Sequence, residues 1–382
     1  MRGKAGLAAL ALLGSLALRA QDDGFAPRAQ GNAAVRAQGD GGAAARAVVL
    51  IVVDGVRWQE VFNGADSALL TRRPGGVNDT LAIRREFWRP TATERRSALF
   101  PFLWGTVATR GVIWGNVTEG SDAHVTNGLK FSYPGYNEML VGVPDQKIDK
   151  NEYGPNPNVT VFEWLRMRKG FKGRVAAFGT WSVFNDIFNP KQSGVFVHAG
   201  WDPPPGRVKG ATERTIDRLY RTTIRYWDDN TYDAFMQSVL LDYVKAKRPR
   251  VLFVGYGETD EWAHARRYDL TLRSAQRADD LIAELWRTMQ AMPEYRDRTT
   301  FIVTTDHGRG SGDKWTDHGR DVEGAEQVWI AMVGPGAPKL GAVKGGTAVT
   351  QSQIAATVAS LLGENYFKSE PRAAPPLIGT RP

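Results

Sequence analysis

The chain has 382 residues, 42% of them hydrophobic, and a formal net charge of +8. This length and composition suffice for the core of one large α/β domain or of two smaller ones. There is no cysteine, which excludes disulfides, a thiol nucleophile and every cysteine-ligated metal site. The positive charge favours anionic substrates, and no nucleic-acid-binding module is recognisable.

Residues 1–20 have the pattern of an export signal. Arg2 and Lys4 form a basic start, GLAALALLGSLAL follows as an apolar run, and LRA precedes Gln21 as a cleavage site. The apolar run is too short and too rich in alanine for a membrane span. We therefore predict a signal peptide, no transmembrane span after its removal, and a periplasmic or secreted location.

The next segment, residues 21–46, consists mainly of Ala, Gly, Gln and Arg, with a near-repeat of RAQG. Such a composition cannot repay the entropy of ordering, so we predict a disordered linker. Residues 47–382 are then one catalytic domain. Within it, residues 143–245 are rich in Trp, Pro, Asn and Tyr and are predicted to form a cap or insertion beside the main sheet.

Short apolar runs alternate with helical patterns through this domain. The runs are typical of strands buried on both faces and lie at 47–54, 174–180, 251–256, 300–306 and 328–334. Helical patterns lie at 214–246, 268–291 and 350–363. The alternation predicts an α/β fold with a doubly wound, mostly parallel sheet flanked by helices.

Polar residues follow three of these strands. Asp54, Asp260 and the pair Asp306-His307 all come at or soon after a strand end. Ligands bind at the carboxyl ends of the strands in an open parallel sheet, so these side chains are the candidates for a functional site.

The same residues suit a metal ion. Asp260 and His264 are four apart and lie on one face if that stretch is helical, whereas Asp306 and His307 can reach one centre where a strand ends. A solvated helix pair and an ordinary strand-to-loop turn are the alternatives for the two motifs taken singly. Carboxylate and imidazole ligands suit Zn²⁺, and also Mn²⁺ or Fe.

The order of the motifs resembles that of the alkaline phosphatase superfamily, which includes the nucleotide pyrophosphatase/phosphodiesterases and the cofactor-independent phosphoglycerate mutases. The resemblance runs from about residue 47 to 364 and rests on VVLIVVDG, FSYPGYNEMLVG, ETDEWAH, TTDHG, a second TDHG and QSQIAATVASLLG. It implies two divalent metal ions, most suitably Zn²⁺, with Mn²⁺ as the alternative. By this resemblance one ion takes Asp260, His264 and His318, and the other takes Asp54, Asp306 and His307.

The resemblance also implies a Ser or Thr nucleophile at the start of a helix, shortly before a proline. Ser132 in SYPGY fits this pattern, and an ordinary helix-capping serine is the alternative. A hydroxyl becomes a good nucleophile when a metal lowers its pKa, and a helix N-terminus suits an anionic phosphoryl group. Asn151, Asn156 and Arg309 are candidates for substrate binding, and Arg309 could equally be a solvated loop residue.

The implied function is hydrolysis of a small-molecule phosphate ester, either a monoester or a diester, through a phospho-enzyme. A phosphoglycerate mutase-like phosphotransferase is the alternative, although 127 residues separate Ser132 from Asp260 and an export signal precedes the domain. A sulfatase is disfavoured because Tyr136 stands where that pattern has Arg. A catalytically inactive envelope protein is disfavoured because every ligand and the hydroxyl are present. The sequence indicates no oligomeric state.

The triplet Asp-His-Gly occurs twice in TTDHGRGSGDKWTDHG. The resemblance assigns Asp306 and His307 of the first copy to the ion beside Ser132. In the second copy His318 alone is a ligand, for the other ion. Asp317 is then an orienting or surface residue.

Overall fold

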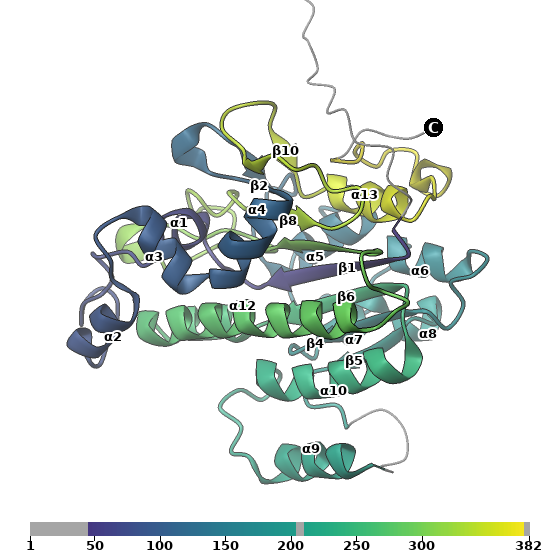
Figure 1. The fold of residues 1–382 in the computed structure, drawn as a ribbon, viewed down its shortest axis with the longest axis horizontal. Coiled ribbons are helices and arrows are strands. Elements are labelled where there is room, and N and C mark those ends of the chain that lie inside the picture. The colour runs from purple at the N-terminus through teal and green to yellow at the C-terminus, as the bar shows by residue number, and fades with distance from the viewer. Residues whose placement is uncertain (1–44, 204–209, 378–382) are drawn as a thin grey trace, which may run out of the picture. The chain divides into compact units, whose positions relative to one another are not determined.

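The computed structural model describes residues 45–203 and 210–377, and within them a central sheet of eight strands (Figure 1). The predicted signal peptide and nearly all of the predicted linker lie outside the described residues. In order across the sheet, the strands are β5 (Phe196–Ala199), β4 (Val175–Gly179), β6 (Val251–Tyr256), β1 (Ala47–Val53), β7 (Thr299–Thr304), β8 (Ile330–Val333), β2 (Val112–Trp114) and β9 (Gly341–Ala342). Strand β8 runs antiparallel to both of its neighbours, and the other neighbouring pairs are parallel.

The continuous apolar sequence of β1 is explained by burial on both faces. Val49 and Ile51 belong to one hydrophobic core, and Val48 and Leu50 belong to the other. Successive side chains of a strand point to opposite faces, so a strand between two cores must be apolar throughout. The fold class is confirmed: a doubly wound, mostly parallel α/β sheet.

Helices cover both faces of the sheet (Figure 1). Those contributing to the core of Val49 are α1 (Trp58–Asn63), α2 (Thr80–Phe87), α3 (Ala92–Leu99), α4 (Ala108–Arg110), α9 (Ala211–Thr222), α10 (Asp233–Lys247), α11 (Glu258–His264) and α12 (Tyr268–Ala291). Those contributing to the core of Val48 are α5 (Ser132–Val141), α6 (Val161–Met167), α7 (Phe184–Phe188) and α13 (Gln353–Leu361). A π-helix η1 (Leu103–Val107), a short helix α8 (Pro190–Ser193) and a small sheet of β3 (Ala123–His124) with β10 (Val349–Thr350) complete the elements used below.

The segment 143–245, predicted as a cap or insertion, contributes β4 and β5 to the central sheet. These strands lie beside β6 and are part of the main fold, because their apolar residues pack into its two cores. The long helix predicted at 214–246 is two helices, α9 and α10. The intervening residues 223–232 contain Thr, Ile, Asp and Asn, which are weak helix formers. The other domain boundaries stay predictions.

In the described part of the chain, no helix combines the length and the apolar character needed to cross a membrane.

Candidate metal centre

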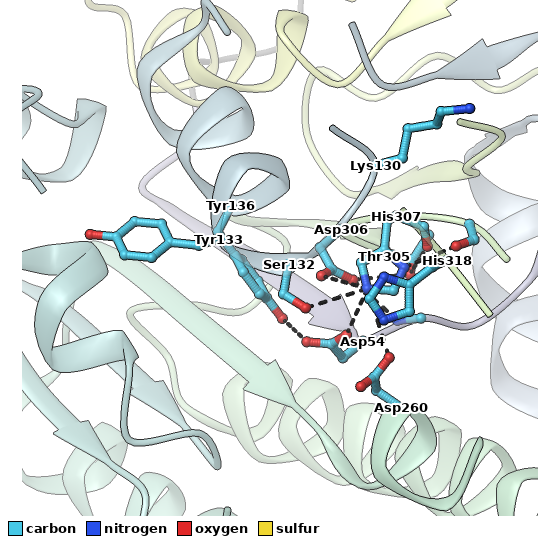
Figure 2. Close-up of polar contacts among 12 residues, drawn as sticks. Asp54, Lys130, Ser132, Tyr133, Tyr136, Asp260, Thr305, Asp306, His307 and His318 are labelled. Carbon is cyan, nitrogen blue, oxygen red and sulfur yellow. Dashed lines mark hydrogen bonds and ion pairs between the residues drawn. The ribbon is translucent and has the colours of Figure 1, made fainter. Parts of the chain in front are cut away.

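The carboxyl ends of three adjacent strands bring the candidate residues together. Strand β1 pairs with β6 on one side and with β7 on the other, both in parallel. Asp54 therefore lies between the start of α11, which follows β6, and the loop after β7 (Figure 2). Gly55 has a φ of +60°, and a Cβ at this position would lie 2.7 Å from Asp260 Oδ1. The Asp-Gly pair thus allows the end of β1 to approach α11 closely.

Asp54, Asp306 and His307 form a buried group of metal-ligand type. His307 Nε2 lies 3.6 Å from Asp54 Oδ1 and 3.4 Å from Asp306 Oδ2. Ser132 Oγ lies 3.4 Å from the same nitrogen. Ligand atoms around a tetrahedral Zn²⁺ with bonds of about 2.0–2.2 Å are separated by about 3.3–3.6 Å. The three separations measured from His307 Nε2 match that requirement.

Asp54, Asp306 and His307 each have one side-chain atom hydrogen-bonded to the rest of the protein and one atom directed at the other two ligands. Tyr136 O–H donates to Asp54 Oδ2, the Gly55 N–H donates to Asp306 Oδ1, and His307 Nδ1–H donates to the Gly308 carbonyl. Among residues 45–203 and 210–377, the buried atoms Asp54 Oδ1 and Asp306 Oδ2 have no hydrogen-bond partner. His307 Nε2 keeps its lone pair because Nδ1 carries the proton. When the two carboxylates are ionised, all three inward atoms are acceptors, which fits a cation.

The electrostatics agree with this reading. Burial, followed by repulsion from Asp306, raises the pKa of Asp54 to about 8. Burial raises the pKa of Asp306 to about 6 and lowers that of His307. Two buried carboxylates this close together are costly when both are ionised, and a divalent cation would offset that cost.

The second group lies beside the first and shares His307 with it. Asp260, His307 and His318 have ligand atoms within 4.8 Å of one another. His264 Nε2 lies 3.0 Å from Asp260 Oδ2 and 3.1 Å from His318 Nε2. The structure thus places the predicted set of Asp260, His264 and His318 in one chain of contacts, with the half-exposed His264 at its outer end. Burial lowers the pKa of His318, which keeps its imidazole in the neutral form that binds metals.

Arg309 lies two residues after His307 in the chain and is buried. Its Nη2 contacts Asp260 Oδ1, its Nε donates to the Gly55 carbonyl, and its Nη1 donates to the Thr316 carbonyl. All three nitrogens are engaged, so in this arrangement the guanidinium balances the charge of Asp260. The alternative of a solvated loop charge is wrong, and the role in substrate binding stays a prediction.

Ser132 is the first residue of α5, the position that the resemblance implies for a nucleophile. Phe131 precedes it in extended conformation, and Pro134 lies in the first turn, where it needs no N–H partner. Ser132 is 6% exposed and its hydroxyl points at His307 (Figure 2). Gly135 allows this approach, because a Cβ there would lie 2.4 Å from the Asp306 carbonyl oxygen.

The two candidate asparagines lie in different surroundings. Asn151 Oδ1 accepts the N–H of Tyr133, the residue after Ser132, and this leaves the Asn151 amide N–H groups as donors beside the helix start. Asn156 donates to Asn137 and to the Ile187 carbonyl and accepts from the Asn158 N–H. Its polar atoms serve the packing of this region, so the structure does not bring Asn156 to the site as a free donor.

Sequence reasoning did not find the supporting contacts. The sequence shows that Tyr136 stands where the sulfatase pattern has Arg, but it does not predict the hydrogen bond from Tyr136 to Asp54. Gln351 donates to the backbone carbonyls of Thr305 and Asp306 and is fully buried. A four-residue spacing between Ser132 and Tyr136 was the available signal, because it puts both side chains on one face of a helix.

Comparisons with known proteins give one family model and several solved structures of similar fold. A family model described as the metalloenzyme superfamily matches residues 211–366, a range that contains Asp260, His264, Asp306, His307 and His318. In solved structures, a phosphonate monoester hydrolase, SpPMH from Silicibacter pomeroyi, aligns with a TM-score of 0.53 and 13% identity over 84% of this chain and 74% of its own. The family-model match and the shared fold agree with the resemblance to the alkaline phosphatase superfamily.

Two further solved structures have a similar fold. The lipoteichoic acid synthase LtaP from Listeria monocytogenes aligns with a TM-score of 0.51 and 11% identity over 84% of this chain and 72% of its own. Ps i-CgsB, in complex with k-i-k-neocarrahexaose, aligns with a TM-score of 0.51 and 14% identity over 87% and 75%. At these identities the likeness concerns the fold. The search of curated proteins found no match.

Proposed function

We propose that the protein is an exported hydrolase of small-molecule phosphate esters that uses Ser132 and two divalent metal ions, Zn²⁺ or Mn²⁺. The observation that carries the proposal is the convergence of Ser132 Oγ, Asp54 Oδ1 and Asp306 Oδ2 around His307 Nε2 at the start of α5. A hydroxyl, two carboxylates and an imidazole at such separations suit a metal-assisted nucleophile.

The residues fall into two ligand sets. Asp54, Asp306 and His307 would hold one ion beside Ser132, and Asp260, His264 and His318 would hold the other. When bound, the two ions would polarise phosphoryl oxygens and lower the pKa of a nearby hydroxyl or water. The neutral state of His318 and the lone pair that His307 Nε2 directs at the ligand group suit this role.

Ser132 Oγ attacks phosphorus, the bond from phosphorus to the leaving alcohol breaks, and a phosphoserine forms. The proton lost by the serine hydroxyl balances the one gained by the departing alkoxide. Water then attacks phosphorus, and the bond from phosphorus to Ser132 Oγ breaks. Phosphate leaves when the substrate is a monoester and a phosphate monoester leaves when it is a diester, and Ser132 regains its proton from the water. The start of α5 and the Asn151 amide offer N–H groups to the phosphoryl oxygens.

The test is turnover by metal-loaded protein of p-nitrophenyl phosphate, bis-p-nitrophenyl phosphate, p-nitrophenyl sulfate and a p-nitrophenyl phosphonate ester. The last is included because a neighbour in fold is a phosphonate monoester hydrolase. We expect a phosphate ester to be hydrolysed fastest and Ser132→Ala to lose that activity. Failure of all four substrates with two ions bound would overturn the proposal.

Export belongs to the same proposal and has its own test. Residues 1–20 are the proposed signal peptide, 21–46 the proposed linker, and 47–382 the proposed catalytic domain. Expression in a Gram-negative host should give mature protein in the periplasm whose sequence begins at Gln21. Recovery of uncleaved protein from the cytoplasm would contradict this part.

A further inference from the structure

Helix α5 carries a second polar side chain directed at the candidate metal centre, four residues after Ser132. The Tyr136 hydroxyl lies 2.7 Å from Asp54 Oδ2 (Figure 2). A four-residue spacing places both side chains on one face of the helix. The helix that presents the proposed nucleophile therefore also contacts one of the proposed metal ligands.

The direction of this hydrogen bond follows from chemistry. A carboxylate oxygen only accepts, so the phenol donates its proton to Oδ2. Tyr136 is 1% exposed, so water cannot replace the bond. Asp54 Oδ2 is thereby occupied, and Oδ1 is the oxygen that remains free and faces His307 Nε2 at 3.6 Å.

The ring of Tyr136 is fixed by its own packing. It meets Phe184 edge-on with centroids 4.8 Å apart and Phe253 with centroids 6.0 Å apart. Because Phe184 and Phe253 hold the ring, the Tyr136 hydroxyl keeps a fixed position relative to the end of β1. The Thr259 hydroxyl also donates to the Asp54 backbone carbonyl, so both the main chain and the carboxylate of Asp54 are held from outside the ligand group.

We propose that Tyr136 is a positioning residue that holds Asp54 with a single oxygen directed at the metal centre. Through the same hydrogen bond, Tyr136 fixes the position of α5 relative to Asp54. The inference rests on the proposed function, in which Asp54 is a metal ligand. Groups that orient metal ligands in this way typically change metal affinity by about 10–100-fold when they are removed.

Tyr133 provides a matched control on the same helix. It is also buried, and its hydroxyl donates to the Gly154 carbonyl at 2.7 Å. Its ring points away from the ligand group (Figure 2). Tyr133→Phe and Tyr136→Phe each remove one hydroxyl and one hydrogen bond of 2.7 Å, so a general loss of stability should affect both variants.

The experiment is a Zn²⁺ titration of chelator-stripped full-length protein in competition with a chromogenic chelator, with no substrate present. We expect Tyr136→Phe to bind at least one Zn²⁺ about 10–100-fold more weakly than wild type, and Tyr133→Phe to bind like wild type. Equal affinities for the two variants would overturn the inference and leave the proposed function standing. A wild-type protein that binds no Zn²⁺ or Mn²⁺ would overturn both.

A second measurement applies even if Tyr136→Phe fails to fold. 3-Fluorotyrosine incorporated at position 136 keeps the hydroxyl and reports its surroundings by ¹⁹F NMR. Addition of Zn²⁺ should shift this resonance, and a chelator should restore it. The same label at position 133 should shift much less; equal shifts at both positions would contradict the proposed role.

Discussion

Asp306 and Asp317 occupy the same place in two Asp-His-Gly triplets, but their carboxylates have different surroundings. Asp306 is fully buried, with one oxygen accepting the Gly55 N–H and the other free beside His307. Asp317 is half-buried, and its Oδ1 accepts the hydroxyl proton of the adjacent Thr316 at 2.7 Å. Only the first triplet thus supplies a carboxylate directed at the metal centre. The first triplet follows the end of β7, whereas the second lies within a loop.

At the scale of single residues, Asp306→Ala should bind Zn²⁺ at least tenfold more weakly than wild type, since loss of a ligand should cost no less than loss of a supporting group. Asp317→Ala should keep the wild-type affinity, because its carboxylate contacts a hydroxyl outside both ligand groups. Titration with Zn²⁺ against a competing chelator measures both. If Asp317→Ala lost as much affinity as Asp306→Ala, the division between the two triplets would be wrong.

At the scale of elements, the approach of α5 to the end of β7 depends on one missing side chain. A Cβ at Gly135 would lie 2.4 Å from the Asp306 carbonyl oxygen, and backbone atoms cannot give way as a flexible side chain can. Gly105 in η1 offers the contrast, because it is exposed and a Cβ there would meet nothing within 4 Å.

Gly135→Ala should therefore destabilise the protein by about 1–3 kcal/mol, as overpacking does, and lower turnover by displacing Ser132. Gly105→Ala should be neutral or stabilising by up to about 1 kcal/mol, because alanine costs less backbone entropy than glycine in a helix. Chemical denaturation gives the free energies of unfolding. Equal effects of the two substitutions would show that α5 can move away from β7 without cost.

A buried carboxylate also links two helical elements. Asp279 on α12 accepts the N–H groups of Phe102 and Leu103 at the start of η1, at 2.6 and 2.9 Å. Burial raises the pKa of Asp279 to about 7. A carboxyl whose pKa is higher in the folded state binds its proton more tightly there, so its contribution to stability falls as pH rises from about 4 to about 7.

Asp279→Asn removes this titration. The stability of the wild type relative to Asp279→Asn should therefore decrease between pH 4 and pH 7, by at most roughly 4 kcal/mol. Free energies of unfolding from urea denaturation at several pH values measure the difference. A difference that is constant across this pH range would show that Asp279 does not titrate there.

The sequence predicts helices and strands where the pattern of residues is local. It does not predict side-chain contacts that depend on how two elements pack against each other. The pattern at 268–291 matches α12, and the segment ETDEWAH, in which Asp260 and His264 share one face only if it is helical, is α11. The break between α9 and α10 is not predicted, because the apolar periodicity of 214–246 favours one continuous helix although residues 223–232 are weak helix formers. The bonds of Tyr136 and Arg309 required the register between α5, β1 and the loop after β7, which spacing alone does not specify.

At the scale of the whole molecule, the candidate ligands come from distant parts of the chain. Asp54 follows β1, Asp260 lies on α11, and Asp306 follows β7, with more than 200 residues between the first and second. An ion held by such residues binds the folded chain and not the unfolded one. Its binding therefore adds to the free energy of unfolding according to the free ion concentration.

Addition of Zn²⁺ to chelator-stripped protein should raise the free energy of unfolding by about 2.7 kcal/mol when the free ion is 100 times its dissociation constant. A chelator should reverse the gain. Asp317→Ala should show the same gain as the wild type. A double variant, Asp260→Ala with Asp306→Ala, should show almost none, because the first ligand group then lacks one of its two carboxylates and the second lacks its only one. Thermal and urea unfolding at several Zn²⁺ concentrations measure this dependence. An equal gain in free energy of unfolding for the double variant and the wild type would mean that the ion binds at another place. The assignment of the two ligand groups would then be wrong.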